Sequence, residues 1–261
     1  MKRPFKIIVI ILWCILVAIG LFGFWLSDQY VVPIMMYHSV NYEKNLEVNT
    51  IHPVNFTRHM EFLRRNHYNV ISLDELVKSM EQSKSLPPKS VVITFDDGYR
   101  DNYTYAFKTL KQYGFPATIF VVTDEIGKEG HLTWKQIREM GKNGITIGSH
   151  TRTHAYLPDI SKEEQMEQIE GSKRILEKRL GHRVNFFAYP TGGFSEQIKG
   201  IVKEAGGYRA ACTTNRGYSR LNKDLYELKR LRFGDEDNSD MILFVKLSGF
   251  YSTFKQAKAP Y

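Results

Sequence analysis

The chain has 261 residues, with 43% hydrophobic and 25% charged side chains, which is the composition of a globular protein with a substantial core. Its net charge is +8 and its pI about 9.3, values that suit a protein working near anionic surfaces such as phospholipid or acidic wall polymers. Since no nucleic-acid motif or dense Lys/Arg stripe is present, we expect no nucleic-acid partner.

The N-terminus carries the signals of a membrane anchor. Residues 1–6 include three basic side chains, and residues 7–26 follow without a charge. A run of this length spans a bilayer as a helix with its basic flank in the cytoplasm. A cleavable signal peptide, which would make the protein secreted, is the alternative, but no small-x-small cleavage site follows the run. We predict a cytoplasmic N-terminus (1–6), a single-pass transmembrane signal anchor (7–26), a short linker (27–30) and an extracellular domain (31–261).

The rest of the chain alternates predicted strands with predicted helices. Strands are expected over residues 31–37, 70–71, 91–95, 117–122, 145–148, 185–189, 209–213 and 228–233. Helices are expected around 56–63 and over 72–80, 103–110, 133–140, 161–180 and 195–205. In the longest helix the buried side chains are predicted to be Met166, Ile169, Leu176 and Leu180.

Repeated strand-helix units imply a parallel sheet with helices outside it. Seven or so strands fit a closed or nearly closed barrel, so we predict an α/β fold of distorted barrel type with its chemistry at the carboxyl ends of the strands. Cys14 lies in the predicted anchor and Cys212 is the only other cysteine, so the fold is not built on disulfides.

Two adjacent carboxylates follow the predicted strand at 91–95. Asp96 and Asp97 come at the mouth of a buried strand, where they are costly unless a cation or a proton compensates them. One alternative is that an aspartate simply caps the helix that begins near Tyr99. Neighbouring strand residues point to opposite faces, so the two acids are not expected to face each other as a glycosidase pair. We expect one carboxylate to bind a metal and the other to hold or accept a proton.

Two histidines follow another predicted strand end, at His150 and His154. Histidines four residues apart share one side of a helical turn, so their imidazoles can converge. Together with Asp97 they would form a two-histidine, one-carboxylate set that leaves positions open on a divalent metal. The alternative is a pair of surface histidines. A metal that acidifies water and polarises a carbonyl, with an aspartate base beside it, hydrolyses amides or esters.

These residues carry a resemblance to a known family. Residues 94–98 (TFDDG) and 150–154 (HTRTH) resemble the first two motifs of the polysaccharide deacetylases, the NodB-homology or carbohydrate esterase 4 family. The resemblance implies a distorted (β/α)7-type barrel, a divalent metal (Zn²⁺, with Co²⁺ or Ni²⁺ as alternatives) and removal of acetyl groups from N-acetylglucosamine units. By position, the family's base corresponds to Asp96, and its metal ligands correspond to Asp97, His150 and His154.

The third family motif, Arg-x-Pro-Tyr, is altered in this chain. Ala188 stands at the position of the arginine and Thr191 at that of the tyrosine. Since a backbone N–H stabilises an oxyanion without any particular side chain, Thr191 is expected to keep that role. Arg230 is the candidate to replace the arginine; the alternatives are a surface charge at Arg230 and a plain turn at Thr191. The predicted substrate contacts in this stretch are Tyr189, Pro190 and Gly192.

The family's late Leu-x-His motif is absent, because no histidine follows His182. Instead, His38 ends the first predicted strand, within MMYHSV. This resembles the subgroup in which that motif has moved to the N-terminus by circular permutation, as in enzymes acting on poly-β-1,6-N-acetylglucosamine. His38 would then protonate the leaving amine, and a merely packed histidine is the alternative.

We therefore predict a monomeric, metal-dependent N-deacetylase of an extracellular or cell-wall polysaccharide, either poly-N-acetylglucosamine or peptidoglycan. The alternative is a catalytically impaired NodB-fold protein that binds glycan, which Ala188 and Thr191 make conceivable. Asp96 and His38 argue against it, because a pure binder needs neither a base nor an acid. The aromatic side chains considered for stacking on sugars are Tyr99, Trp134 and Phe194.

Overall fold

The computed structural model describes residues 3–43, 49–214, 217 and 221–251, with residues 3–10 and 27–28 described by their backbone alone. Its strands are β1 Ile34–Tyr37, β2 Ser39–Val40, β3 Thr50–Ile51, β4 Asn69–Val70, β5 Ser90–Phe95, β6 Ala117–Val121, β7 Ile145–Ser149, β8 Phe186–Ala188, β9 Ala210–Cys212 and β10 Leu231–Arg232. Its α-helices are α1 Arg3–Asp28, α2 Pro53–Arg65, α3 Leu73–Gln82, α4 Phe107–Tyr113, α5 Trp134–Gly141, α6 Lys162–Met166, α7 Ser172–Leu180, α8 Glu196–Gly200 and α9 Asp240–Lys246. Shorter helical turns are the π-helical η1 Asn102–Ala106, η4 Glu167–Gly171 and η6 Ile201–Ala205, and the 3₁₀ turns η2 Thr123–Glu125, η3 Leu157–Asp159 and η5 Pro190–Gly192.

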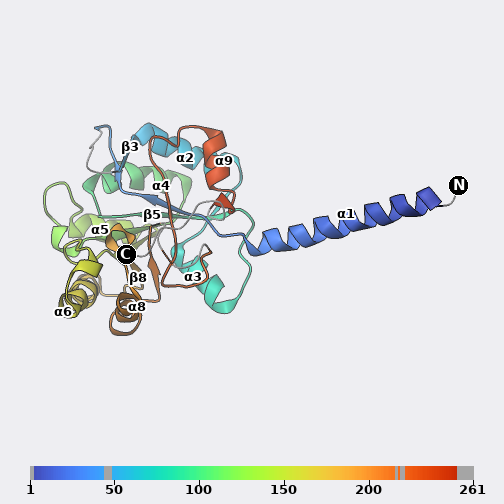
Figure 1. Ribbon diagram of the computed structural model, residues 1–261. Helices are drawn as coiled ribbons and strands as arrows, with labels where there is room; N and C mark the ends of the chain where they lie inside the picture. Colours follow the sequence, from blue (N-terminus) through green and yellow to red (C-terminus); the bar gives the residue numbers. More distant parts are fainter. Residues whose placement is uncertain (1–2, 44–48, 215–216, 218–220, 252–261) are drawn as a thin grey trace.

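Helix α1 projects away from the rest of the chain (Figure 1). Large apolar side chains along it, from Ile11 to Trp25, are exposed. Within the described residues, no helix combines the length and the apolar character needed to cross a membrane. The transmembrane span predicted for residues 7–26 includes residues 7–10, whose side chains lie outside the described part of the chain. The span therefore stays a prediction.

The domain is an α/β fold built on a curved sheet of parallel strands. The strand order is β10-β1-β5-β6-β7-β8-β9, every neighbouring pair is parallel, and β4 pairs with the start of β5. Leu228 forms a bridge with Cys212 in β9, and three residues later Leu231 pairs with Met35 in β1. The short segment 228–232 therefore connects the two edges of the sheet, and the helices lie around its outside (Figure 1). This confirms the prediction of parallel strands in a barrel-like α/β fold.

Each predicted strand has a counterpart in the structure. The sequence did not predict the short strands β2 and β3 or helix α9. All six residues of β5 are buried, as expected for a strand covered on both faces. One buried cluster brings together side chains from different strands, and we call it the inner cluster; its members include Ile34, Val92, Phe120, Phe186 and Leu228.

One predicted core residue is wrong. Met166 is 38% exposed, and its neighbour Gln165 is buried in its place. The cause is the π-helical turn η4, which follows Met166 and holds more residues per turn than an α-helix, so it changes which side chains face the sheet. Ile169 and Leu176 are buried, as predicted.

Candidate active site

The predicted catalytic and metal-binding side chains lie together at the carboxyl end of the barrel. Side chains alternate between the two faces of a strand, so a residue two or four positions beyond an inner-cluster residue points the same way. Asp96 lies four residues after Val92, and its backbone N–H still donates to the Tyr37 carbonyl, 3.0 Å away. His150 likewise keeps the ladder by donating to the Val121 carbonyl at 2.9 Å. We call the group that meets here the barrel mouth; it consists of His38, Asp96, Asp97, His150, His154 and Arg230.

Three side chains of the barrel mouth form a cluster suited to a metal ion. Ligand atoms of Asp97, His150 and His154 all lie within 4.8 Å of one another. The Asp97 Oδ1 atom lies 3.6 Å from His150 Nε2 and 3.4 Å from His154 Nε2. This carboxylate oxygen is buried and accepts no hydrogen bond from the described residues, a costly arrangement that a cation would relieve.

The protonation state of His150 also fits a metal ligand. Its Nδ1 atom lies 2.7 Å from the Ala188 carbonyl oxygen, which can only accept, so Nδ1 carries the proton and Nε2 offers its lone pair toward Asp97. Burial lowers the pKa of His150, against the opposing effect of Asp96 and Asp97, and so favours the neutral imidazole that binds metals. The donor set therefore fits a divalent cation of the zinc type.

The convergence of the two histidines has a different cause from the one predicted. Residues 150–154 do not form a helical turn; they follow β7 as irregular chain. Thr151 and His154 have positive φ angles of 68° and 59°, and the His154 N–H donates to Thr151 Oγ1 at 3.0 Å. These two left-handed residues fold the backbone back, and the imidazole ring centroids end 4.9 Å apart.

Asp96 is paired with Arg230, the residue proposed to replace the missing arginine. Arg230 is fully buried and donates two hydrogen bonds to the carboxylate, at 2.6 Å to Oδ1 and 2.7 Å to Oδ2. Burial alone would raise the pKa of Asp96, but Arg230 and the nearby His150 and His38 outweigh it and hold the pKa well below the usual range. Asp96 is therefore a fixed carboxylate at neutral pH. Arg230 is not a surface charge.

The third-motif stretch lies beside this pair. Thr191 is exposed and has a left-handed backbone with φ 53°. Thr213 Oγ1 donates to the Gly192 carbonyl at 2.9 Å, while the Thr213 carbonyl accepts from Arg230 Nε at 2.9 Å. Thr213 thus links the turn that carries Thr191 to the arginine that holds Asp96.

The three predicted substrate contacts of this stretch, Tyr189, Pro190 and Gly192, are buried. The Tyr189 ring stacks on Phe194, and its hydroxyl donates to the Tyr226 carbonyl at 3.2 Å. Because Tyr189 and Phe194 are completely buried, their side chains do not present a surface for a sugar, contrary to the stacking considered for Phe194.

His38 is half-buried at the end of β1. Burial lowers the pKa of its imidazole, while the negative charges of Asp96 and Asp97 oppose that effect, which places His38 within electrostatic reach of both acids. Its Nδ1 atom has no hydrogen-bond partner among the described residues.

Sequence reasoning missed two contributors to the site. These are the Ala188 carbonyl that orients His150 and Thr213, whose carbonyl accepts from Arg230. Thr213 directly follows a strand, and that position in the sequence could have indicated it. The role of a backbone carbonyl at Ala188 leaves no mark in residue identity.

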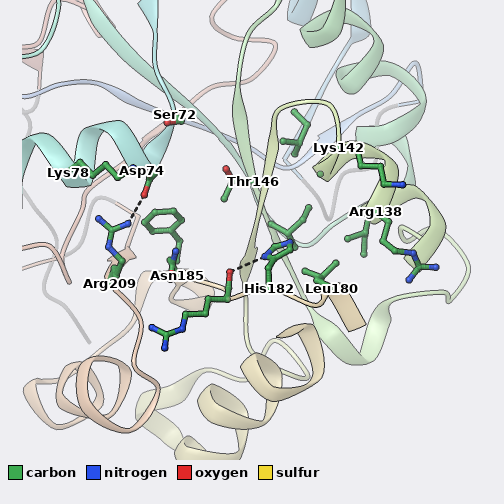
Figure 2. A pocket seen from close by; sticks show the side chains of 16 residues that line it. Ser72, Asp74, Lys78, Arg138, Lys142, Thr146, Leu180, His182, Asn185 and Arg209 are labelled. Carbon is green, nitrogen blue, oxygen red and sulfur yellow. Dashed lines mark hydrogen bonds and ion pairs between the residues drawn. The ribbon is translucent and has the colours of Figure 1, made fainter. Parts of the chain in front are cut away.

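A cavity of about 840 Å³ lies at the opposite end of the barrel (Figure 2). Thr146, Asn185 and Arg209, which come from the beginnings of β7, β8 and β9, line it. Arg209 is tied there to Asp74 at 2.5 Å (Figure 2), and His182 is among the lining residues. This cavity is therefore separate from the barrel mouth, and His182 takes no part in the candidate active site.

Comparison with known proteins agrees with this geometry. Residues 83–210 match the family model described as polysaccharide deacetylase. A Bacillus subtilis (strain 168) protein, YxkH, provisionally named a polysaccharide deacetylase, is 35% identical over 201 residues, which cover 77% of this chain and 71% of that protein. A poly-β-1,6-N-acetyl-D-glucosamine N-deacetylase of Staphylococcus epidermidis is 30% identical over 185 residues. The matched region covers 59% of this chain and 64% of that enzyme.

A solved structure has a similar fold. The Streptococcus pyogenes deacetylase PplD, in complex with acetate, superposes with a TM-score of 0.76 and 28% identity, covering 83% of this chain and 97% of that one. The fold, the barrel mouth and these relatives define a class of carbohydrate-active hydrolase. The chain belongs to the polysaccharide deacetylase family, which confirms the resemblance drawn from its motifs.

Proposed function

We propose that this enzyme removes N-acetyl groups from N-acetylglucosamine units of poly-N-acetylglucosamine, using a divalent metal held by Asp97, His150 and His154. The observation that carries the proposal is the buried Asp97 Oδ1 atom, which accepts no hydrogen bond from the part of the chain that the structure describes and lies near two histidine Nε2 atoms. The next residue in sequence, Asp96, has a carboxylate kept ionised by Arg230. The substrate class is supported by the Staphylococcus epidermidis relative, which is named for that polymer, and by the position of His38 at the end of β1.

The residues of the barrel mouth divide the chemistry as follows. A bound divalent cation supplies Lewis acidity, polarising the acetyl carbonyl and making water more acidic. Asp96 accepts the proton of the water that attacks the carbonyl carbon, and Arg230 keeps the carboxylate charged and correctly oriented. The backbone N–H of Thr191 is the candidate donor to the oxyanion.

His38 completes the reaction. When the carbon–nitrogen bond breaks, its electron pair stays on the sugar nitrogen, which takes a proton from the His38 imidazolium. The products are acetate and a glucosamine unit. An amine is a poor leaving group unless it is protonated, so this step depends on an acid in place.

Acetate release by the purified full chain tests the proposal. Three substrates of equal N-acetylglucosamine content separate the substrate classes: a β-1,6-linked oligomer, a β-1,4-linked chitin oligomer and peptidoglycan. We expect the β-1,6 oligomer to be preferred, chelation to abolish the reaction and Zn²⁺, Co²⁺ or Ni²⁺ to restore it. Metal-independent acetate release would contradict the metal role, and preference for peptidoglycan would contradict the substrate.

Two variants separate the metal from the base. Asp96→Asn should lose turnover by about 10²–10⁴-fold, the range for a general base, with its metal content nearly unchanged. His150→Ala should lose the metal itself. His182→Ala, in the cavity at the opposite end, is the matched histidine control and should behave as wild type. Normal turnover by Asp96→Asn would refute the assigned base.

We also propose that the domain works outside the cell, tethered by residues 7–26. The uncharged run behind a basic flank supports this placement. Protease added to intact cells should digest the domain if it is tethered outside. Recovery of the domain from the culture medium would indicate instead that the N-terminal segment is cleaved.

A further inference from the structure

The turn that follows Gly98 connects two parts of the barrel mouth. On one side, its first residue, Tyr99, lies two positions after the candidate metal ligand Asp97. On the other side, Asp101 and Asn102 reach across to residues 38–40. A single turn of chain therefore begins just after a candidate metal ligand and contacts the segment that carries the candidate acid.

Three hydrogen bonds join this turn to the His38 segment, and a fourth, between Asn102 and Asp101, lies within the turn. The Asp101 carboxylate accepts from Ser39 Oγ at 2.6 Å and from the Val40 N–H at 3.0 Å. The Asn102 Nδ2 atom donates to the His38 carbonyl at 2.7 Å and to Asp101 Oδ1 at 2.9 Å. Since Asn102, Ser39 and Val40 are buried, water competes little for these groups.

The position of the His38 ring depends on this backbone. Its buried Nδ1 atom has no partner among the described residues, so no hydrogen bond at that atom orients the imidazole. The two peptide groups that follow its Cα are held instead, the first through the His38 carbonyl and the second through the Val40 N–H. A shift of this backbone would carry the imidazole with it.

We propose that Asp101 and Asn102 are positioning residues that hold His38 where its proton reaches the leaving amine. This inference rests on the proposed function. Neither residue touches the reacting atoms; each acts through the backbone of residues 38–40.

Burying the polar side chains of Asp101 and Asn102 costs free energy, and this cost favours a role in positioning His38 over a purely structural role in the loop. Burial raises the pKa of Asp101 even though Ser39, Val40 and Asn102 all lower it, so keeping this carboxylate ionised opposes folding. The buried Asn102 Oδ1 atom, moreover, accepts no hydrogen bond from the described residues. Polar groups held at such cost are typical of functional sites.

The test compares two substrates that differ in their need for an acid. Release of acetate from an N-acetylglucosamine oligomer requires protonation of the amine, whereas 4-nitrophenyl acetate releases a phenolate that needs no proton. The variants are Asp101→Asn and Asn102→Ala, with His38→Ala as the reference for loss of the acid. Thr104→Ala is the matched control, because Thr104 lies in the same turn and its hydroxyl donates to the Arg100 carbonyl, away from residues 38–40.

If Asp101 and Asn102 position the acid, both variants lose amide turnover by about 10–100-fold, the cost of a misplaced catalytic group, and keep ester turnover and metal content near wild type. They then resemble His38→Ala, while Thr104→Ala resembles the wild type. Equal losses on both substrates, or no loss on the amide, would overturn the inference.

Hydrogen exchange provides a readout that does not need turnover. Asp101→Asn should speed exchange of the Val40 amide, which donates to Asp101, without changing that of the His150 amide, which donates to Val121. Unchanged Val40 exchange would overturn the inference whatever the activity. Failure of the wild type to release acetate from any polymer would instead overturn the proposed function, and the exchange result would still decide about the turn.

Discussion

Replacing Arg230 by methionine should destabilise the protein by about 3–5 kcal/mol at neutral pH, the cost of removing one partner of a buried ion pair. The side chain is completely buried, and its two hydrogen bonds to Asp96 are short, at 2.6 and 2.7 Å. Methionine fills similar space without a charge, so Asp96 would stay buried without its counter-cation. Removing both charges, in Asp96→Asn with Arg230→Met, should cost less than Arg230→Met alone.

The pH dependence of this effect has a definite sign. In the wild type the pKa of Asp96 is lowered on folding, so its contribution is fully present above the unfolded value of about 4 and is lost as the pH falls through the folded value. Without Arg230, burial raises the pKa of Asp96, and the variant takes up its proton at higher pH. The unfolded state is the same for both proteins, so the difference in unfolding free energy between wild type and variant should begin to narrow as the pH falls through the raised pKa of Asp96 in the variant, above about 4, and continue to narrow toward the lowered wild-type pKa.

Equilibrium urea unfolding at pH 7 and pH 3.5, with a chelator present throughout, measures this effect without a contribution from metal binding. Arg230→Lys is a useful second variant, because an ammonium keeps the charge but loses the bidentate geometry. A loss below about 1 kcal/mol in Arg230→Met would refute the reasoning, since that is the range of an exposed ion pair. A difference in unfolding free energy between wild type and Arg230→Met that is the same at pH 7 and pH 3.5 would also refute it.

Two further predictions concern other parts of the barrel. Burial raises the pKa of Cys212 to about 12, so in a Cys14→Ser background the folded protein should not react with a disulfide reagent at pH 8 until urea unfolds it; rapid labelling of the folded protein would contradict this. Gly192→Ala should cost about 1–3 kcal/mol in thermal or urea unfolding and reduce acetate release, because its φ is +76° and a Cβ would lie 2.3 Å from Thr214 Oγ1. Gly114→Ala, with a φ of +68° but nothing within 4 Å of its Cβ, is the matched control and should cost less; equal losses would show that the contact with Thr214 is unimportant.

The sequence predicted the overall fold and the convergence of the site because both follow from local periodicity. Parallel strands place their carboxyl ends together, so His38, Asp96 and His150 were expected at one end of the barrel. The structure places all three there. All of β5 is apolar or buried, so the sequence alone does not show which face of that strand points inward.

What could not be predicted depends on backbone conformation or on contacts distant in sequence. Nothing in HTRTH indicates that Thr151 and His154 adopt left-handed conformations, which are unusual for a β-branched residue such as Thr151. The π-helical turn that exposes Met166 and buries Gln165 has no clear sequence signature either. The pairing of Arg230 with Asp96 was proposed from the missing motif, but its bidentate geometry requires the closing segment 228–232 in place.

That closing segment also bears on how the domain is made. Asp96 precedes its counter-cation by 134 residues, and the strand that brings Arg230 is the last in the sheet. If the sheet buried Asp96 before Arg230 had been synthesised, the carboxylate would be removed from water without a counter-charge, at a cost of several kcal/mol. The partly synthesised barrel is therefore unstable when closed, and the active site forms only when the fold is complete.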